Sequence, residues 1–564
     1  MTIRKAIAAA CACAAAFAAC TDRPARDPRG DEQPPGARRG GTLVIAIADD
    51  AGILDPQLAA EPGGFAMIRA TQRGLMAFPS AEDPAEASAP LPDLAARAPE
   101  VSADGRQFTF TLRDGPAFGP PASRPVRAAD VKAGIERAFL VGSAPASSLR
   151  VIAGAADFEA GRATTIAGIE TPDERTVRFR LTGPANDLTW ILAHTGASAV
   201  PAGTPPAIAP KDLSASGPYR IDRIVAGREV RLVRNEAWSE GSDPVRGAYV
   251  DEIVARVGAP GAADLTGEAV APPQDAAMQA VDGGCLLYLF VRPEGDFTAR
   301  NARAAISVAI DRAALVADVT SATGSFTATP TVSLLSPVVA GAATRPLPPG
   351  DAAEARRLLG RDLPIAFGRE TFGPNAAEDV AAAAAITRML AAAGMRATPL
   401  TVRAPGSIYD TYQRGRAPMG LARWCPDWPG RAVRTMVGAP AGTGGVANYS
   451  GTSDPVLDDL IAAALAERDP GRIAAATAAA ADRAVAIATI IPLAFLADRV
   501  AVSARVHGFA PHPFFVRGDP ANVWLAEPAP SPVPAPSGSI ARGSASTGAV
   551  RYTFGVPTTN GGVS

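Results

Sequence analysis

The chain has 564 residues, enough for two to four domains or one large body with several lobes. Its formal net charge of −2 provides no basic field of the kind that attracts nucleic acid. Its three histidines, His194, His507 and His512, lie far apart and form no spaced set of metal ligands. Composition therefore argues against a nucleic-acid partner and against a histidine-rich metal site.

The N-terminus has the pattern of a secretory signal. Arg4 and Lys5 precede an apolar run over Ala6–Ala19, which is too short to span a bilayer because that needs about 20 residues. Small residues precede Cys20 and resemble a bacterial lipobox, in which the cysteine is lipidated after cleavage; ordinary signal cleavage nearby is the alternative. The expected terminal segments are a signal peptide over 1–19, a disordered tether over 20–39 and a disordered tail over 526–564.

Two cysteines, Cys285 and Cys425, remain once the N-terminal ones have left or been lipidated. Export to an oxidising compartment favours a disulfide between them. Such a bond would close a loop of about 140 residues and stabilise the fold by roughly 5 kcal/mol in the chain-entropy model. Two free buried thiols are the alternative.

The first part of the body alternates strands with helices. Period-two alternation places Phe108, Phe110 and Leu112 on one face of a strand that follows a turn at Asp104–Gly105. The other elements expected here are a strand over Gly40–Ala48, a turn at Leu54–Pro56, a helix over Met67–Met76, and a helix over Pro125–Leu140 with Val131, Ile135 and Phe139 inward.

Four motifs in this region occur in the order and spacing of a known family. They are GGTLVIA and LDP within 40–56, LPDLA at 91–95, DGRQFTFTLRDGPAF at 104–118, and RPVRAADVK with RAF within 124–139. Together they resemble the extracytoplasmic solute-binding proteins of peptide, nickel and related ABC importers. The resemblance runs from Gly40 to Leu525. It is poorest over 255–284, so we expect one wall of the ligand cleft to differ there.

The resemblance also orders the rest of the chain. A strand before Thr298 and a helix over Thr298–Val316, capped by Thr298, look like the opening of the second large lobe. The further expected elements are strands at Thr176–Leu181, after Ser216–Ile221 and over Arg231–Trp238; helices over Ala352–Gly360 and Asn375–Gly394, the second capped by Asn375; a helix approach over Asn448–Ile461; and a return crossing over Ile491–Phe495 and Val502–Phe509.

The resemblance implies an α/β fold of two lobes, similar to type II periplasmic binding proteins of the large cluster that carry an extra inserted domain. Two crossing connections form a hinge, and the ligand lies between the lobes. The implied divisions are lobe I over 40–80, 198–283 and 495–525, the inserted domain over 81–197, and lobe II over 284–494.

The oligopeptide-binding branch of this family contains a Trp-Cys-x-Asp segment, which Trp424, Cys425 and Asp427 match. There the aspartate pairs with the peptide's α-ammonium, and the cysteine bonds to one that stands where Cys285 stands here. The resemblance therefore implies that Asp427 faces a ligand amine. Without it, the segment would read as a tryptophan-anchored loop with a surface acid.

This chain departs from the branch pattern at Pro426 and Trp428. Arg423 directly precedes the motif and could pair with Asp427 inside the protein, which would weaken amine recognition. The predicted ligand-binding residues are Asp427, Trp424, Trp428, Tyr449 and Arg423, with Tyr219 as a further cleft candidate; for both tyrosines a packed core position is the alternative.

These patterns favour a lipid-anchored, monomeric binding protein that captures peptides or peptide-like solutes and delivers them to ABC permease subunits, without a cofactor. The first alternative keeps the fold and changes the ligand to a metal chelate, haem, opine or sugar. The second is an envelope lipoprotein for sensing or chaperoning. An enzyme is disfavoured because the sequence contains no GxSxG, HExxH, phosphate-loop or catalytic Cys–His pattern.

Overall fold

The computed structural model describes residues 36–526 except 48–53, 60–61, 144–145, 259–262, 268–275, 325, 338, 340–341, 343–344, 361, 370–375, 401–407, 429, 432 and 513–517. The predicted signal peptide, Cys20 and nearly all of the predicted tail lie outside these residues. Arg38 and Arg39, at the end of the predicted tether, contact the body: Arg38 donates to the Ala526 carbonyl and Arg39 pairs with Glu240 at 2.7 Å. None of the described helices is long and apolar enough to cross a bilayer.

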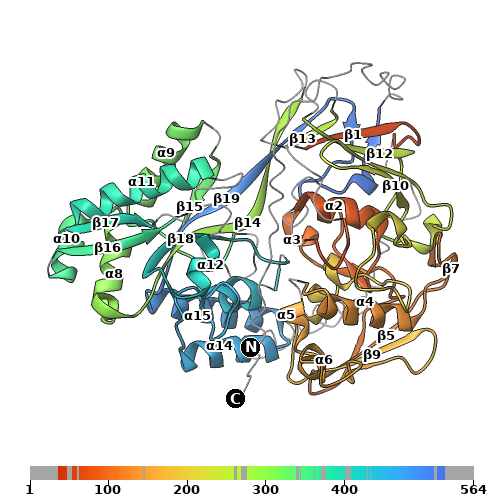
Figure 1. Cartoon of the computed structure of the whole chain (residues 1–564), viewed down its shortest axis with the longest axis horizontal. Coiled ribbons are helices and arrows are strands. Elements are labelled where there is room, and N and C mark those ends of the chain that lie inside the picture. The colour runs from red at the N-terminus through yellow and green to blue at the C-terminus, as the bar shows by residue number, and fades with distance from the viewer. Residues whose placement is uncertain are drawn as a thin grey trace, which may run out of the picture.

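A single mixed sheet runs through two lobes (Figure 1). Its order within the described residues is β10-β11-β12-β1-β13-β19-β14-β18-β16-β17, with β15 paired to β19. The two long strands β14 (Ala277–Val291) and β19 (Ile490–Val502) pair antiparallel and pass from one lobe to the other. These two strands are the crossing connections that the resemblance implied. Both lobes share them as part of one sheet.

The first lobe contains the strands on one side of this pair. β1 (Thr42–Ile47) lies parallel to β12 (Glu252–Val257) and β13 (Leu265–Gly267), while β10 (Tyr219–Val225) and β11 (Glu229–Arg234) form an antiparallel edge. Apolar residues of β1 and its neighbours, such as Leu43, Val230 and Ile253, are buried in one cluster.

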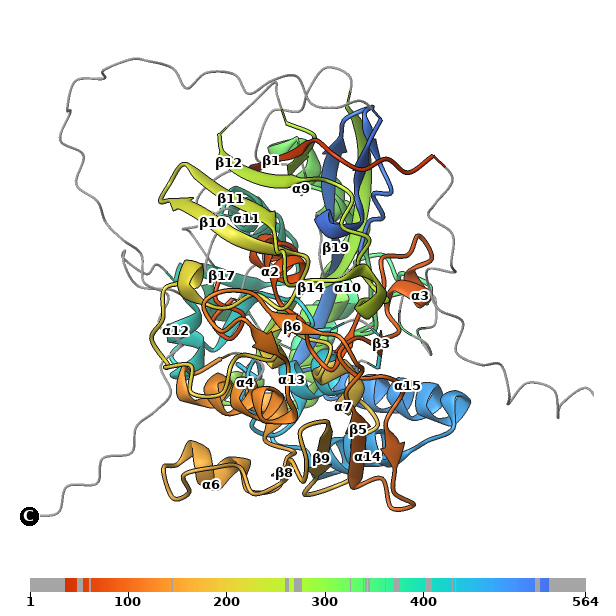
Figure 2. The same ribbon diagram turned by 90° about the vertical axis from the view of Figure 1, so that its right-hand side faces the viewer.

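A second core in the same lobe, which we call the N-terminal cluster, gathers buried side chains that, apart from one, lie between Ala59 and Ala199. The backbone that carries them lies in the red to gold part of the ribbon in Figure 2. The predicted face of Phe108, Phe110 and Leu112 is buried in it, because alternate residues of β5 point inward. Its elements are α2 (Pro62–Thr71), α4 (Ala128–Leu140), and a small sheet of β4 (Glu100–Val101), β5 (Gln107–Thr111), β9 (Thr176–Arg180) and β8 (Ile169–Glu170).

The second lobe packs helices on β18 (Met419–Trp424), β16 (Leu363–Gly368) and β17 (Met395–Leu400). Aspartate side chains cap several of these helices by accepting backbone N–H groups, as Asp454 does from Leu457. The helices are α8 (Arg300–Ala309), α9 (Arg312–Thr323), α10 (Ala352–Leu359), α11 (Ala376–Ala392), α12 (Ile408–Gln413), α14 (Pro455–Ala466) and α15 (Pro470–Ala486).

Short strands, short α-helices and a π-helical turn lie between these elements. They are β2 (Met76–Ala77), α3 (Pro84–Ala87), β3 (Leu91–Pro92), β6 (Ala117–Phe118), β7 (Arg124–Pro125), α5 (Ala146–Leu149), α6 (Ala155–Glu159), α7 (Leu188–Ile191), β15 (Ala328–Pro330), a π-helical turn over Val433–Gly438, α13 (Ala439–Ala441), β20 (Val506–His507) and β21 (Trp524–Leu525).

Two expected helices differ from those in the structure. The helix expected over Met67–Met76 begins at Pro62 and ends at Thr71, and Met76 starts β2. The helix expected over 298–316 is two helices, because Asp311 caps a new one by accepting from the Ala314 N–H. Thr298 does not cap α8, whose N-cap is Ala299, and its hydroxyl donates to the Gly295 carbonyl instead. The expected cap at Asn375 lies outside the described residues.

The first lobe also buries a network of charges. Asp93 accepts from Arg73 Nε at 2.7 Å and from Arg246 Nη1 at 2.9 Å, and all three side chains are inaccessible or nearly so. Asp243 lies between the same two arginines, and Arg69 pairs with Asp519 at 2.6 Å. The network joins α2, the LPDLA motif and the segment between β20 and β21, so it links three distant parts of the chain inside the first lobe.

Candidate ligand site at the disulfide-bonded loop

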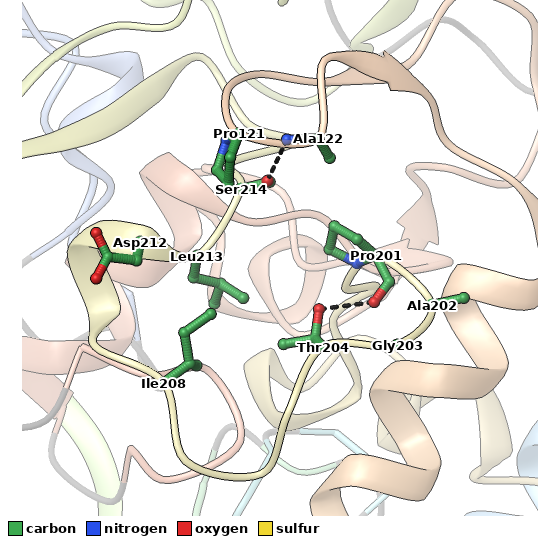
Figure 3. A pocket seen from close by; sticks show the side chains of 10 residues that line it. All are labelled: Pro121, Ala122, Pro201, Ala202, Gly203, Thr204, Ile208, Asp212, Leu213 and Ser214. Atoms are coloured by element: carbon green, nitrogen blue, oxygen red, sulfur yellow. Dashed lines mark hydrogen bonds between the residues drawn. The ribbon is translucent and has the colours of Figure 1, made fainter.

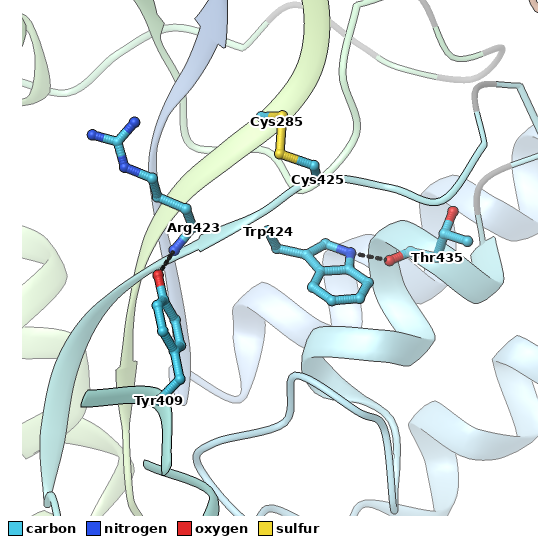
Figure 4. The surroundings of a disulfide bond; sticks show 6 residues. All are labelled: Cys285, Tyr409, Arg423, Trp424, Cys425 and Thr435. Carbon is cyan, nitrogen blue, oxygen red and sulfur yellow. Dashed lines mark hydrogen bonds between the residues drawn. A yellow bond between two sulfur atoms is a disulfide. The ribbon is translucent and has the colours of Figure 1, made fainter. Parts of the chain in front are cut away.

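The end of β18 is joined to β14 by a disulfide between Cys285 and Cys425 (Figure 4). The two strands run antiparallel, and Leu286 lies opposite Trp424. The next pair in this register is Cys285 and Cys425, so the two cysteines face each other. The pair that the structure joins is the pair expected from the cysteine count. It fixes the loop that begins at Cys425 to one of the two strands that cross between the lobes.

We expect this bond to be detectable in a form of the protein that begins at Thr21 and so lacks the three N-terminal cysteines. Denatured without reductant, it should show no reactive thiol. Replacing both cysteines by serine should lower the free energy of unfolding in urea by about 3–5 kcal/mol, because a disulfide across a long loop restricts the unfolded chain. Two reactive thiols in the unreduced protein would contradict the bond.

Arg423 points away from the loop and is already paired. Its Nε donates to Asp379 and its Nη2 to Glu378, both at 2.8 Å, and both acids lie on α11. Burial opposes the guanidinium charge, but the two carboxylates raise its pKa above the usual value. The internal Arg423–Asp427 pair that would weaken amine recognition is therefore not formed, and Arg423 is engaged by the protein rather than turned to a ligand.

Trp424 and Tyr449 are largely committed to the second lobe. The Trp424 indole donates to the Thr435 carbonyl at 2.5 Å, and its ring is partly buried against the core (Figure 4). Tyr449 packs against Phe290, Tyr409 and Tyr412, and burial raises its phenol pKa. Tyr449 is thus a packed aromatic, as is Tyr219, whose buried hydroxyl donates to the Val250 carbonyl.

Asp427 is the one predicted ligand residue with a charge that the described part of the chain leaves uncompensated. Its side chain is partly exposed, and none of the described residues gives it a cation or a hydrogen-bond donor. Desolvation by the surrounding protein alone raises the pKa of this carboxyl to about 6. A carboxylate in such a place is costly until a positive group reaches it.

Trp428, the next residue, lies in the first lobe. Its side chain is 0% exposed and belongs to the N-terminal cluster, in which every other described member lies between residues 59 and 199. Its indole donates weakly to the Arg431 carbonyl at 3.4 Å. Trp428 is therefore a core residue at the boundary between the lobes and presents no surface to a ligand.

A surface pocket of about 280 Å³ lies elsewhere, between the loops at 121–122 and 201–214 (Figure 3). Its polar groups already have partners: Ser214 accepts from the Ala122 N–H at 3.0 Å, and Thr204 donates to the Pro201 carbonyl at 2.6 Å. No group of three or more metal-ligating side chains occurs among the described residues. We assign no ligand to this pocket.

The residues that meet the Asp427 loop from the first lobe were not predicted. Asn186, Asp187 and Trp190 contact the segment that follows Trp428, notably Arg431 and Arg434. No local spacing marks them, because the contacts join segments more than 240 residues apart. The low number of tryptophans, five in the chain, is the one signal that singles out Trp190.

A family model described as bacterial extracellular solute-binding proteins, family 5 Middle, matches residues 89–437. The probable D,D-dipeptide-binding periplasmic protein DdpA of Escherichia coli (strain K12) is 26% identical over 201 residues, which are 34% of this chain and only 36% of that protein.

Two solved structures share the whole fold. Clavulanic acid biosynthesis oligopeptide binding protein 2 matches with a TM-score of 0.76 at 23% identity, covering 87% of this chain and 96% of that one. Listeria monocytogenes OppA bound to peptide matches with a TM-score of 0.64 at 16% identity, covering 86% and 99%. These matches show a two-lobed α/β fold of the periplasmic binding protein type.

Proposed function

Because this chain belongs to the family 5 bacterial extracellular solute-binding proteins, we propose that it captures peptides or peptide-like solutes between its lobes and delivers them to an ABC permease. The relatives support this ligand class, since one is named as a dipeptide-binding protein and another was solved with a peptide. The family consists of binding proteins of the extracytoplasmic space, and no catalytic step is part of the proposal.

The observation that carries the proposal is the uncompensated carboxylate of Asp427. A peptide's α-ammonium has an ordinary pKa near 8 and is charged at neutral pH. Placed on Asp427, it would supply the missing counter-charge and form a charge-assisted hydrogen bond in a partly desolvated site. Trp424, which is partly buried beside the disulfide, would border the same ligand end.

We further propose that the mature protein is a monomer anchored to the membrane by a lipid on Cys20. The lobes would be divided as the sequence suggests, with the ligand between lobe I, its inserted domain and lobe II. The disulfide supports this arrangement because it attaches the Asp427 loop to a strand that crosses between the lobes.

The test is calorimetry with peptides of two to six residues, guided by mass spectrometry of small molecules that co-purify with the protein. We expect a free-amine peptide to bind and its N-acetylated form to bind at least about 100-fold more weakly, because acetylation removes the charge that Asp427 requires. Equal binding of the two forms would contradict the amine anchor. Binding of no peptide, together with a co-purified solute of another class, would contradict the peptide assignment.

A further inference from the structure

The segment after Asp427 docks the second lobe onto the first. Trp428 inserts into the N-terminal cluster, and α14 forms the lower edge of the second lobe next to the first lobe in Figure 1. Separating the lobes here would expose this fully buried tryptophan, because the core that surrounds it is formed by residues of the first lobe. Loss of such a side chain from a core is among the larger single effects in protein stability.

An ion pair with a fully buried carboxylate lies in the same interface. Asp187 is 0% exposed, and both of its oxygens accept from Arg434: Oδ2 from Nε at 2.7 Å and Oδ1 from Nη2 at 3.1 Å. Burial opposes the charge on Arg434, but Asp187 raises the pKa of the guanidinium. Breaking this pair would leave the Asp187 carboxylate buried without its cation, so separation of the lobes is unfavourable until water reaches that carboxylate.

Asn186 adds backbone recognition to the same interface. Its N–H donates to the Leu465 carbonyl at 3.0 Å, and its side-chain amide donates to the carbonyls of Ala464 and Glu467 at 2.7 and 2.8 Å. These carbonyls lie at the C-terminal end of α14, where the last carbonyls of a helix lack partners within it. The first lobe therefore supplies the cap of a helix in the second lobe.

A cation–π contact adds to the interface. The Arg431 guanidinium lies 4.9 Å from the centre of the Trp190 ring, and the Trp190 indole is fixed by donating to the Ser88 carbonyl at 2.9 Å. Arg431 also donates to the Asn186 carbonyl at 3.4 Å. The contacts are thus of four different kinds, and all of them span the two lobes.

We propose that Trp428, the Asp187–Arg434 pair and the Asn186 contacts form a lock that holds the lobes together without a ligand, with Trp428 as a positioning residue for Asp427. Neighbouring Cα atoms are 3.8 Å apart, so the position of Trp428 in the first lobe restricts where the Asp427 backbone, and with it the carboxylate, can lie. A ligand that binds Asp427 in this position favours the closed arrangement of the lobes, and the lock favours the same arrangement. Ligand binding and the lock must therefore stabilise each other. Only this coupling rests on the proposed function.

The test measures the distance between the lobes in the ligand-free protein. Spin labels would be placed on the exposed positions Leu140 of α4 and Val380 of α11, in the form that begins at Thr21. We expect mainly short distances in the wild type, and a shift of most of the population to longer distances in Arg434→Ala and in Trp428→Ala. Trp428→Phe should restore most of the short population, because a large ring can still fill the N-terminal cluster.

The matched control is Arg483→Ala, which removes an ion pair with Asp454 at 2.6 Å inside the second lobe. It should leave the distances unchanged. Unchanged distances in folded Arg434→Ala and Trp428→Ala would overturn the lock, as would a wild type that is already open without ligand. No peptide enters these measurements, so a failure of the peptide assignment leaves this result intact. For a peptide that binds, Arg434→Ala should raise Kd about tenfold.

Discussion

Replacing Asp427 by asparagine is expected to raise the Kd of a free-amine peptide by roughly 100-fold, equivalent to about 3 kcal/mol. The substitution keeps the shape of the side chain and removes the charge that has no partner among the described residues. The variant should fold at least as well as the wild type, because a desolvated carboxylate without a cation opposes folding. Calorimetry at pH 7.5 measures the loss of affinity, and urea unfolding measures the stability.

The same carboxyl should make binding depend on pH. Its pKa of about 6 lies above the usual 3.8, so the ligand-free folded state holds this proton more tightly than the unfolded state. The contribution of this carboxyl to the free energy of unfolding of the ligand-free protein is therefore fully present below about pH 4 and is lost as the pH rises through 6. A peptide ammonium needs the ionised form, so affinity should fall about tenfold for each pH unit below 6.

Asparagine at position 427 should abolish this pH dependence between pH 5 and 7, where the peptide amine stays protonated. Asp459→Asn is the control, since it removes an exposed acid of the second lobe. It should change neither the affinity nor the pH profile. A variant at position 427 that binds free-amine peptides as tightly as the wild type, or that keeps the wild-type pH profile, would assign amine recognition to another group.

Local patterns in the sequence were sufficient for most strands and helices. The side chains of Phe108 and Phe110 are buried as the alternation predicted, because the two-residue period of a strand decides which side chains share a face. The break between α8 and α9 had a local signal, because Asp311 is a favoured N-cap residue. The apolar residues on both sides of Asp311 fitted one continuous helix and hid this break. Element boundaries therefore fail where a cap competes with periodicity.

The site was predictable only in part. The disulfide was expected from the cysteine count, and Asp427 was singled out by a short motif through the family resemblance; neither needs knowledge of distant segments. The positions of Arg423 and Trp428 depend on long-range partners, namely the acids of α11 and the N-terminal cluster. A local sequence pattern does not reveal such partners. Both residues were therefore predicted to contact the ligand, whereas their side chains contact other parts of the protein.

The LPDLA motif, which carried part of the family resemblance, has a structural explanation in the buried charges of the first lobe. Its aspartate, Asp93, is inaccessible and bridges Arg73 and Arg246. Burial opposes the charge of Asp243 beside them, but the two arginines hold its pKa below the usual value. Stability from Asp243 is therefore present above its unfolded pKa, near 4, and is lost as pH falls through the lower folded pKa.

Replacing Asp93 by asparagine should lower the free energy of unfolding by about 3–5 kcal/mol, because it leaves two buried guanidinium groups without one of their shared carboxylates. That is a large part of the 5–15 kcal/mol that typically holds a protein folded. Urea unfolding measures the loss, and Glu100→Gln is the control, since its pair with Arg97 is 66% and 70% exposed and should contribute less than about 1 kcal/mol. If Asp93→Asn stays within 1 kcal/mol of the wild type, the two arginines must be neutralised by Asp243 alone, and the motif needs another explanation.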